Sequence, residues 1–233
     1  KNPESLHSRS LTTWLEVYKI LHWEFPPEDL EFHFNNLPED YLETVKVEEA
    51  ALHMRLTRSL KNKSFIFNHY YNAAGKFHQV TLCCLTKFDA FKTLVGTLTA
   101  QNINILEAKI FVRKDGIIII SANIEQSKKL TEDNLEVWKN LKKDLKSIFE
   151  GQKNLQKILT NRTRYTSKEE PIKPRISKVV IDNTSDSSFS IVRIEAQDHI
   201  GMLYKISKVF ADFKIQIHSA KISTQGGLGI DVF

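Results

Sequence analysis

The chain has 233 residues, of which 41% are hydrophobic, 26% charged and 10% aromatic, a composition typical of a soluble globular protein of one or two domains. Its formal charge of +5 is unevenly spread, because the stretch from Lys142 to Lys178 carries eleven Lys and Arg residues against four Asp and Glu. This basic excess belongs to a connector and disfavours a folded nucleic-acid-binding face. The longest aliphatic run, Ile117 to Ile120, is too short to cross a bilayer, and the first residues lack the apolar segment of a secretory signal.

The first sixty residues predict helices. One helical pattern ends at Pro26-Pro27, and Pro38 is well placed in the first turn of a short second helix. The stretch "VKVEEAALHMRLTRSL" predicts a further helix, with Glu48 and Glu49 at its favourable N-terminal end. The apolar positions at helical spacing are Leu11, Trp14, Leu15, Tyr18, Leu21 and Phe25 in the first pattern, and Leu52, Leu56 and Leu60 in the last.

From Ser64 the pattern becomes that of strands. "SFIFNHYY" and "KFHQVTLCCL" predict two strands, and "INILEAKIFV" and "GIIIISANI" predict two more that turn at Lys114-Asp115-Gly116. Between the two pairs, a helix is marked by Phe91, Leu94, Val95 and Leu98. Cys83 and Cys84 are neighbours on one strand, so their side chains point to opposite faces, and we expect two reduced thiols in a cytoplasmic protein.

A second helical pattern follows these strands. Thr131 is placed to cap a charged helix, "EDNLEVWKNLKKDLKSIF", which Gly151 ends. A polar, basic linker, "NRTRYTSKEEPIKPR", then leads to a strand, "SKVVID".

The strand-helix-strand-strand pattern then occurs a second time. A shift of 112 residues places Ile103 on Ile215, Leu94 on Ile206, and "INILEAKI" on "IQIHSAKI". So many apolar positions in one register indicate an internal repeat. Each copy has the order βαββαβ of ferredoxin-like folds, so the predicted fold class is α+β.

The second copy is predicted to be incomplete at its C-terminus. It lacks counterparts of the helix around Trp138 and of the strand around Val179, so we expect the natural protein to continue or a partner to supply these elements. The predicted organisation is a helical segment at 1–62, a first repeat at 63–184 that includes the basic linker before its last strand, and a truncated second repeat at 185–233.

A candidate site lies where the first strand of the second repeat breaks, at Asp198-His199-Ile200-Gly201. Gly201 has no Cβ, so a ligand can approach the backbone, and the amides at a helix N-terminus favour a carboxylate. Asp198 is placed to accept from a ligand amine, so the junction suits a small zwitterion such as an amino acid. The alternative is that Asp198 caps the helix and Gly201 only serves a tight connection.

The ordered set of motifs resembles the C-terminal tandem ACT-domain region of the bacterial bifunctional protein-PII uridylyltransferase/uridylyl-removing enzymes. The matching stretches are "NLPEDYL", "EEAALHMRL", "NILEAKIFVRKDG", "VVIDNTSDSSFSIVRIEAQDHIGMLY" and "IHSAKIST". The resemblance extends from about Leu37 to the last residue. The helices around Trp14 to Phe25 are similar, less specifically, to those that follow the HD hydrolase domain of this family.

The resemblance implies an amino-acid sensor, with glutamine as the expected ligand. In that family the ACT pair tells upstream catalytic domains whether to attach or remove UMP on the signalling protein PII, which controls nitrogen metabolism. The implied partners are upstream catalytic domains and PII, with a homodimer through the ACT sheets as a further option, and no membrane or nucleic acid. The ligand-facing positions carried over from the resemblance are Asp198, His199, Ile200, Gly201, Met202, Leu203, Ile217 and His218.

The first repeat departs from this pattern, because Asp89 stands where the second repeat has Gly201. Its side chain and charge oppose a bound carboxylate, so we expect a structural partner without a site of its own. No catalytic set is recognised: the chain has no His-Asp pair for an HD hydrolase and no Gly-Ser loop with paired aspartates for a nucleotidyltransferase. Mg²⁺ and nucleotide are therefore expected only in upstream domains, and no cofactor or metal in this segment.

His53 is expected to satisfy a helix-packing contact and not to bind metal, and Gly226-Gly227 is expected to form a hairpin turn and not a phosphate loop. A ligand-insensitive ACT scaffold for dimerisation remains the alternative function. A ferredoxin-like RNA binder is disfavoured, because "AKIFVRKDG" and "AKISTQGG" lack the aromatic set that such readers use.

Overall fold

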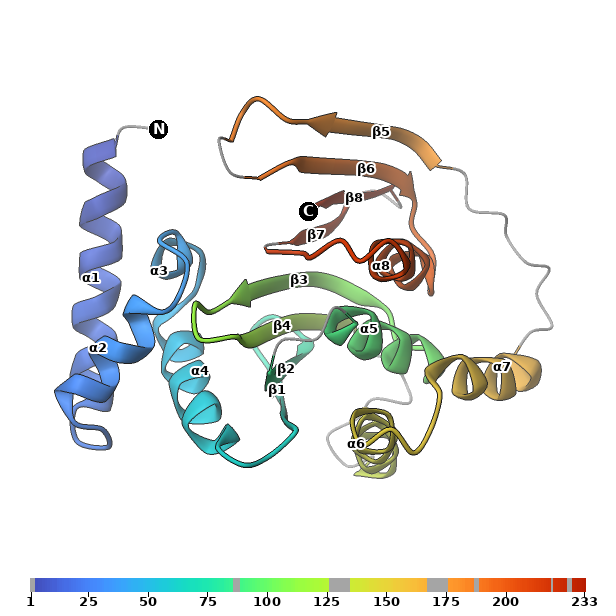
Figure 1. The fold of residues 1–233 in the computed structure, drawn as a ribbon, viewed down its shortest axis with the longest axis horizontal. Coiled ribbons are helices and arrows are strands. Elements are labelled where there is room, and N and C mark those ends of the chain that lie inside the picture. Colours follow the sequence, from blue (N-terminus) through green and yellow to red (C-terminus); the bar gives the residue numbers. More distant parts are fainter. Residues whose placement is uncertain are drawn as a thin grey trace. The chain divides into compact units, whose positions relative to one another are not determined.

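A computed structural model of the chain describes residues 3–85, 89–125, 135–166, 176–186, 189–218, 220–225 and 228–233 (Figure 1). The chain divides into two compact units. The helical unit comprises Lys1–Ile66, Cys83–Thr86 and Phe111–Ile119, and the sheet unit comprises Phe67–Leu82, Lys87–Ile110 and Ile120–Phe233. We describe each unit by itself.

The order of elements confirms the predicted α+β class, with helices first and two related sets of strands after them (Figure 1). The helices are α1 (Pro3–Leu21), α2 (Pro27–Asn35), α3 (Tyr41–Thr44), α4 (Val47–Leu60), α5 (Ala90–Ala100), α6 (Leu135–Phe149), α7 (Leu155–Thr166) and α8 (Met202–Asp212). The strands are β1 (Phe65–Asn72), β2 (Phe77–Leu85), β3 (Ile105–Val112), β4 (Ile117–Glu125), β5 (Ile176–Asp182), β6 (Ile191–Gln197), β7 (Lys221–Gln225) and β8 (Leu228–Val232).

The helical unit has its own hydrophobic core. Its helices bury an apolar stripe that Cys83, Phe111 and Ile119 complete from the strands assigned to the same unit. The helical side of this core is formed by Val17, Leu21, Leu30, Leu37, Tyr41, Val45, Ala50, Ala51 and Met54. The predicted stripe on the first helix was partly wrong, since Leu11 and Leu15 are exposed and Val17 is buried instead.

Buried polar groups in this unit satisfy one another. His53 is fully buried, and its Nδ1 lies 2.8 Å from the hydroxyl of Tyr41, so its predicted packing role is confirmed. The Nδ1 atom of His33 accepts from the Arg113 guanidinium and lies 3.1 Å from the Thr57 hydroxyl. Asp115 binds the other side of the same guanidinium at 2.7 and 2.9 Å. His33, Thr57 and Arg113 are buried, and Asp115 binds the guanidinium from the surface. A buried network of this kind is expected to be hydrogen-bonded.

The eight strands form one sheet in the order β1-β2-β4-β3-β7-β8-β6-β5. The two halves of this order mirror each other, with β3 and β7 joined antiparallel at the centre through the pairs Glu107↔Ser223 and Ala108↔Ile222. The 112-residue shift places Ala90 on Met202 and Ala100 on Asp212, which are the two ends of α5 and α8. The internal repeat predicted from sequence is therefore present in the structure.

The strand "SKVVID" lies elsewhere than predicted. It forms β5 and pairs antiparallel with β6 of the second repeat, from Ile176↔Ala196 to Asp182↔Ile191, whereas we expected it to close the first repeat. The corresponding edge of the first half is occupied by β1, next to β2. The same shift brings β1 onto β5, because each repeat begins with a hairpin that supplies its own edge strand. The second repeat therefore has all four of its strands.

Helices α5 and α8 pack against each other in the sheet unit, and α5 also contacts α6 and α7. Gly96 permits this close packing, since a Cβ at that position would lie 2.7 Å from Leu155 Cδ2 and 2.9 Å from Tyr204 Cδ2. Helix α7 was not predicted: residues 155–166 lie in the segment that we assigned to the basic connector, yet Leu155, Ile158 and Leu159 are buried. These three apolar residues, which lie within five positions, pack this part of α7 against α5.

Local details follow the predictions more closely. Gly151 follows α6 with a φ of +72°, as expected for a residue that ends a helix. Strand β7 begins at Lys221, later than the predicted start at Ile215. The predicted cap Thr131 and the predicted turn residues Gly226 and Gly227 lie outside the described residues.

Both cysteines are buried free thiols, as predicted, and burial raises the pKa of the Cys83 thiol far above its usual value. None of the helices in the described ranges is both long enough and apolar enough to span a membrane.

Candidate functional site

The start of α8 has the geometry of an open helix end. Strand β6 ends at Gln197, and Gly201 is the N-cap residue with a φ of +92°, which L-residues rarely adopt. Gly201, and not Asp198, therefore occupies the cap position, and it has no side chain with which to cap the helix. The Met202 amide donates to the His199 carbonyl at 3.0 Å. The next two amides, of Leu203 and Tyr204, are among those that an α-helix leaves without an intrahelical acceptor.

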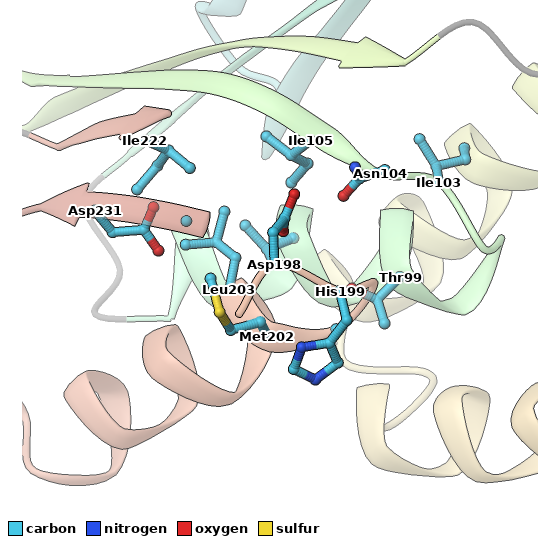
Figure 2. A pocket seen from close by; sticks show the side chains of 13 residues that line it. Thr99, Ile103, Asn104, Ile105, Asp198, His199, Met202, Leu203, Ile222 and Asp231 are labelled. Atoms are coloured by element: carbon cyan, nitrogen blue, oxygen red, sulfur yellow. The ribbon is translucent and has the colours of Figure 1, made fainter. Parts of the chain in front are cut away.

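A pocket opens beside this helix end, within the sheet unit (Figure 2). Both repeats line it: the first contributes α5 and the start of β3, and the second contributes the β6–α8 connection, α8, β7 and β8. The lining residues are Val95, Thr99, Ile103, Asn104, Ile105, Asp198, His199, Gly201, Met202, Leu203, Ile222, Gly229 and Asp231. The pocket thus lies between the β3–β7 pairing and the contact of α5 with α8.

The polar groups of the pocket are mainly hydrogen-bond acceptors. Figure 2 shows the carboxylates of Asp198 and Asp231 among the lining side chains, with Asn104 facing Asp198 from the first repeat. His199 Nδ1 lies 3.1 Å from the Gln197 carbonyl, which can only accept, so Nδ1 carries the proton and neutral His199 presents Nε2 as an acceptor. That Nε2 atom is buried and has no hydrogen-bond partner among the described residues. Among the described residues, neither Lys nor Arg lines this pocket.

The remaining walls are apolar and close-fitting. The pocket has a volume of about 360 Å³ when the space open to solvent is included, but its enclosed interior has room for only a water-sized molecule. Met202 lies over Gly229 so closely that a Cβ at residue 229 would be 2.6 Å from the methionine Cε. Because Met has three rotatable side-chain bonds, it is the wall that can move most easily to admit a larger guest.

The structure brings together five of the eight site residues predicted from sequence: Asp198, His199, Gly201, Met202 and Leu203 all line the pocket. Ile200, which we also placed there, is 40% exposed and does not line it. The adjoining positions Ile217 and His218 also lie outside the lining, and the exposed ring of His218 is 4.5 Å from that of Phe189. These two precede β7, which begins only at Lys221.

Sequence reasoning missed the residues that reach the pocket from elsewhere. Thr99, Asn104 and Ile105 come from the first repeat, and only the pairing of β3 with β7 brings them near α8. Asp231 lies in the terminal "DVF", to which the sequence analysis assigned no role. The sequence signal that could have identified Asp231 is a charged residue at an inward-facing position of a strand with alternating apolar residues.

The corresponding helix start in the first repeat has a different backbone. Asp89 is the N-cap residue of α5 with a φ of −105°, and its carboxylate lies 3.9 Å from Lys92 Nζ. Residues 86–88, which precede Asp89 in the first repeat, lie outside the described residues. An aspartate with this backbone lacks the left-handed conformation that exposes the amides beside Gly201.

The helical unit contains a second cavity, of about 670 Å³ including open solvent, beside the His33–Arg113 pair. Its charged residues are largely paired, Arg113 with Asp115 and Arg58 with Asp29. Within the described ranges, no group of three or more His, Cys, Asp or Glu residues is arranged to hold a metal ion.

Comparisons with known proteins confirm the predicted resemblance. Residues 178–233 match the family described as ACR9-like, ACT-like domain. The chain is 28% identical over 164 residues to a bifunctional uridylyltransferase/uridylyl-removing enzyme from Azospirillum brasilense, an alignment that covers 66% of this chain and 17% of the enzyme. It is 27% identical over 150 residues to the enzyme of that name from Rhodospirillum rubrum, covering 61% of this chain and 15% of the enzyme. The chain thus spans less than a fifth of the length of these curated relatives.

Proposed function

We propose that this chain is a regulatory amino-acid-sensing region, with glutamine as its ligand, and that it belongs to a longer uridylyltransferase. The observation that carries the proposal is the pocket at the open end of α8, where backbone amides, two carboxylates and apolar walls converge. Amides at a helix N-terminus suit a ligand carboxylate, and acidic side chains suit its ammonium group. A zwitterion of the size of an amino acid combines both groups.

The proposed ligand enters where Gly201 exposes the backbone. Its carboxylate accepts from the amides of Leu203 and Tyr204, and its side chain displaces Met202 from Gly229. The apolar walls formed by Ile105 and Ile222 enclose the aliphatic part of the ligand.

Binding at this position offers a route for regulation. The pocket is bounded by the β3–β7 pairing and by the α5–α8 contact, so a ligand that wedges it open changes how the two repeats pack. The ligand then favours the arrangement of the two repeats for which it has the higher affinity. The size of the shift is set by the ratio of its affinities for the two arrangements. We propose that upstream catalytic domains respond to this change by attaching UMP to, or removing it from, a PII-type protein, as the names of the curated relatives suggest for the chemistry.

Isothermal titration calorimetry of the intact chain with glutamine tests the proposal. We expect one site per chain, because Asp89 replaces the glycine in the first repeat. Glutamine is also expected to raise the melting temperature, since a ligand that binds only the folded state stabilises it. Two equal sites per chain would contradict the assignment of the site to the second repeat, and no heat with glutamine or any other amino acid would overturn the sensor.

The narrow interior of the pocket favours a second candidate function, a ligand-insensitive scaffold. In that case Met202 permanently fills the space and the sheets serve only for assembly. Gel filtration that shows a dimer, together with a melting temperature unchanged by any amino acid, would support the scaffold instead.

A further inference from the structure

The side chain of Asp231 places a carboxyl group at a buried position of the sheet, where an apolar side chain is expected. It lies on β8 between Ile222 of β7 and Ile194 of β6, which are its paired residues on the two neighbouring strands. Only 1% of Asp231 is exposed, and neither carboxylate oxygen has a hydrogen-bond partner among the described residues. A buried carboxylate without a partner is unfavourable, so its presence calls for a physical reason.

The first repeat shows that the fold does not require this carboxyl group. In the first repeat the Arg113 amide donates to the Ile117 carbonyl at 2.8 Å, so Ile120 lies opposite Ile110, the counterpart of Ile222. Ile120 therefore corresponds to Asp231, and it is fully buried. The first repeat thus has an aliphatic residue at the position equivalent to Asp231. It also lacks the glycine that begins helix α8 in the second repeat. The second repeat differs from the first at both positions, Gly201 for Asp89 and Asp231 for Ile120. Both differences fall in the lining of the same pocket.

Among the described residues that line the pocket around Asp231, none is a Lys or Arg. Burial, and then the charge of Asp198, raise the pKa of Asp231 to about 7. The Ser223 backbone amide, which does not meet hydrogen-bond geometry with the carboxylate, acts in the opposite direction. The titratable residues that line the pocket, from every element that forms it, are Asp198, His199 and Asp231. Apart from His199, the described lining offers no positive charge to stabilise the ionised carboxylate, and a guest with an ammonium group supplies one.

We propose that Asp231 is the specificity-determining residue that binds the ammonium group of the ligand, so that the pocket accepts free amino acids and rejects their 2-oxo and N-acyl analogues. This inference rests on the proposed amino-acid site. It adds which residue of that site binds the ammonium group of the ligand. A protonated amine donates a charge-assisted hydrogen bond to the Asp231 carboxylate. A 2-oxo acid instead places a carbonyl oxygen next to this carboxylate, and both groups can only accept. A buried group left without its partner in this way gives strong discrimination.

Proton linkage follows from the same arrangement. Near neutral pH the free protein holds Asp231 partly protonated, and a bound ammonium ion favours the ionised form, so binding releases protons. Affinity is then expected to fall as the pH drops below about 7, approaching about tenfold per pH unit.

The test is calorimetric titration of the intact chain with glutamine, N-acetylglutamine and 2-oxoglutarate, at pH 7 in buffers of different ionisation enthalpy. We expect binding of glutamine alone, with proton release. Asp231→Asn is expected to weaken glutamine binding at least tenfold and to abolish the proton release. Asp212→Asn, an equally conservative change at the exposed end of α8, is the matched control and should leave both unchanged.

The folded state of the variants is checked by urea unfolding without ligand. Asp231→Asn, and Asp231→Ile, which installs the residue of the first repeat, are expected to be more stable than the wild type at pH 8, because each removes a buried charge. Lower stability of both variants would mean that the carboxylate has a structural partner and would overturn the inference.

The outcomes separate the inference from the proposed function. Glutamine binding of equal affinity in wild type and Asp231→Asn, or binding of 2-oxoglutarate as tight as that of glutamine, would overturn the role of Asp231 while leaving the sensor intact. Absence of binding by every amino acid tested would overturn both.

Discussion

Gly201 and Thr99 are in contact across the two repeats: a Cβ built on Gly201 would lie 3.3 Å from the Thr99 Cγ2. The glycine belongs to the N-terminus of α8 and the threonine to the last turns of α5. Both line the pocket, so the residue that opens the helix end also sets how closely the neighbouring repeat approaches it.

Gly201→Asp, which installs the residue of the first repeat, is expected to abolish glutamine binding. The new side chain brings charge to the proposed carboxylate position, and its Cβ crowds Thr99 at a φ of +92°. The backbone strain alone is expected to cost about 1–2 kcal/mol of stability. Calorimetry measures the affinity, and circular dichroism establishes that the variant is folded.

Gly151→Ala is the matched control for this backbone effect. Gly151 also has a positive φ, of +72°, but a Cβ there meets nothing within 4 Å. We expect a similar loss of stability with unchanged glutamine affinity. Affinity retained by Gly201→Asp would remove the assignment of the site.

Gly96→Ala is expected to weaken the packing of α5 against α7 and α8. The added methyl group meets Leu155 and Tyr204 at less than 3 Å, and such overpacking costs about 1–3 kcal/mol. Thermal unfolding measures the loss, and Leu155→Ala in the same chain should recover part of it. Additive effects of the two substitutions would contradict the predicted contact.

Tyr41→Phe is expected to destabilise the helical unit by about 1–3 kcal/mol, because it removes the hydroxyl that pairs with His53 in a buried site. Urea unfolding measures the change. Tyr18→Phe removes a hydroxyl from a half-buried ring of the same unit and is expected to cost less. Equal effects of the two substitutions would argue against the Tyr41–His53 bond.

Stability is expected to fall as the pH drops through about 6.5, the usual pKa of histidine in an unfolded chain. Burial, and then the charges of Arg113 and His53, hold the pKa of His33 well below its usual range. The folded state therefore binds fewer protons than the unfolded state, and acid favours unfolding. Urea midpoints at pH 7.5 and 5.5 measure this dependence.

His33→Asn supplies the comparison for that measurement, since an amide oxygen can replace Nδ1 as the acceptor for Arg113. The pH dependence should be smaller in the variant. Asp231, whose pKa is raised, contributes the opposite slope in both proteins, so only their difference reports on His33. An identical slope in both would contradict the buried neutral histidine.

The success of the repeat prediction and the error over β5 have one physical origin. Alternation and helical spacing are local properties, so they identified the strands and the helices α5 and α8 in their common register. They carry no information about which edge a strand joins. Strand "SKVVID" follows a connector that reaches either repeat, and only its hydrogen bonds to β6 decide the choice.

The sequence by itself determined the α+β class, the internal repeat and the open helix start at Gly201, because a glycine between a strand and an amphipathic helix constrains the local backbone. Only the tertiary structure decided that Asn104 and Ile105 share this pocket. It also decided that the Asp231 carboxyl group is buried there with no hydrogen-bond partner in the described part of the chain. These relationships join residues about a hundred positions apart, and they arise from strand pairing and burial, which depend on the whole fold.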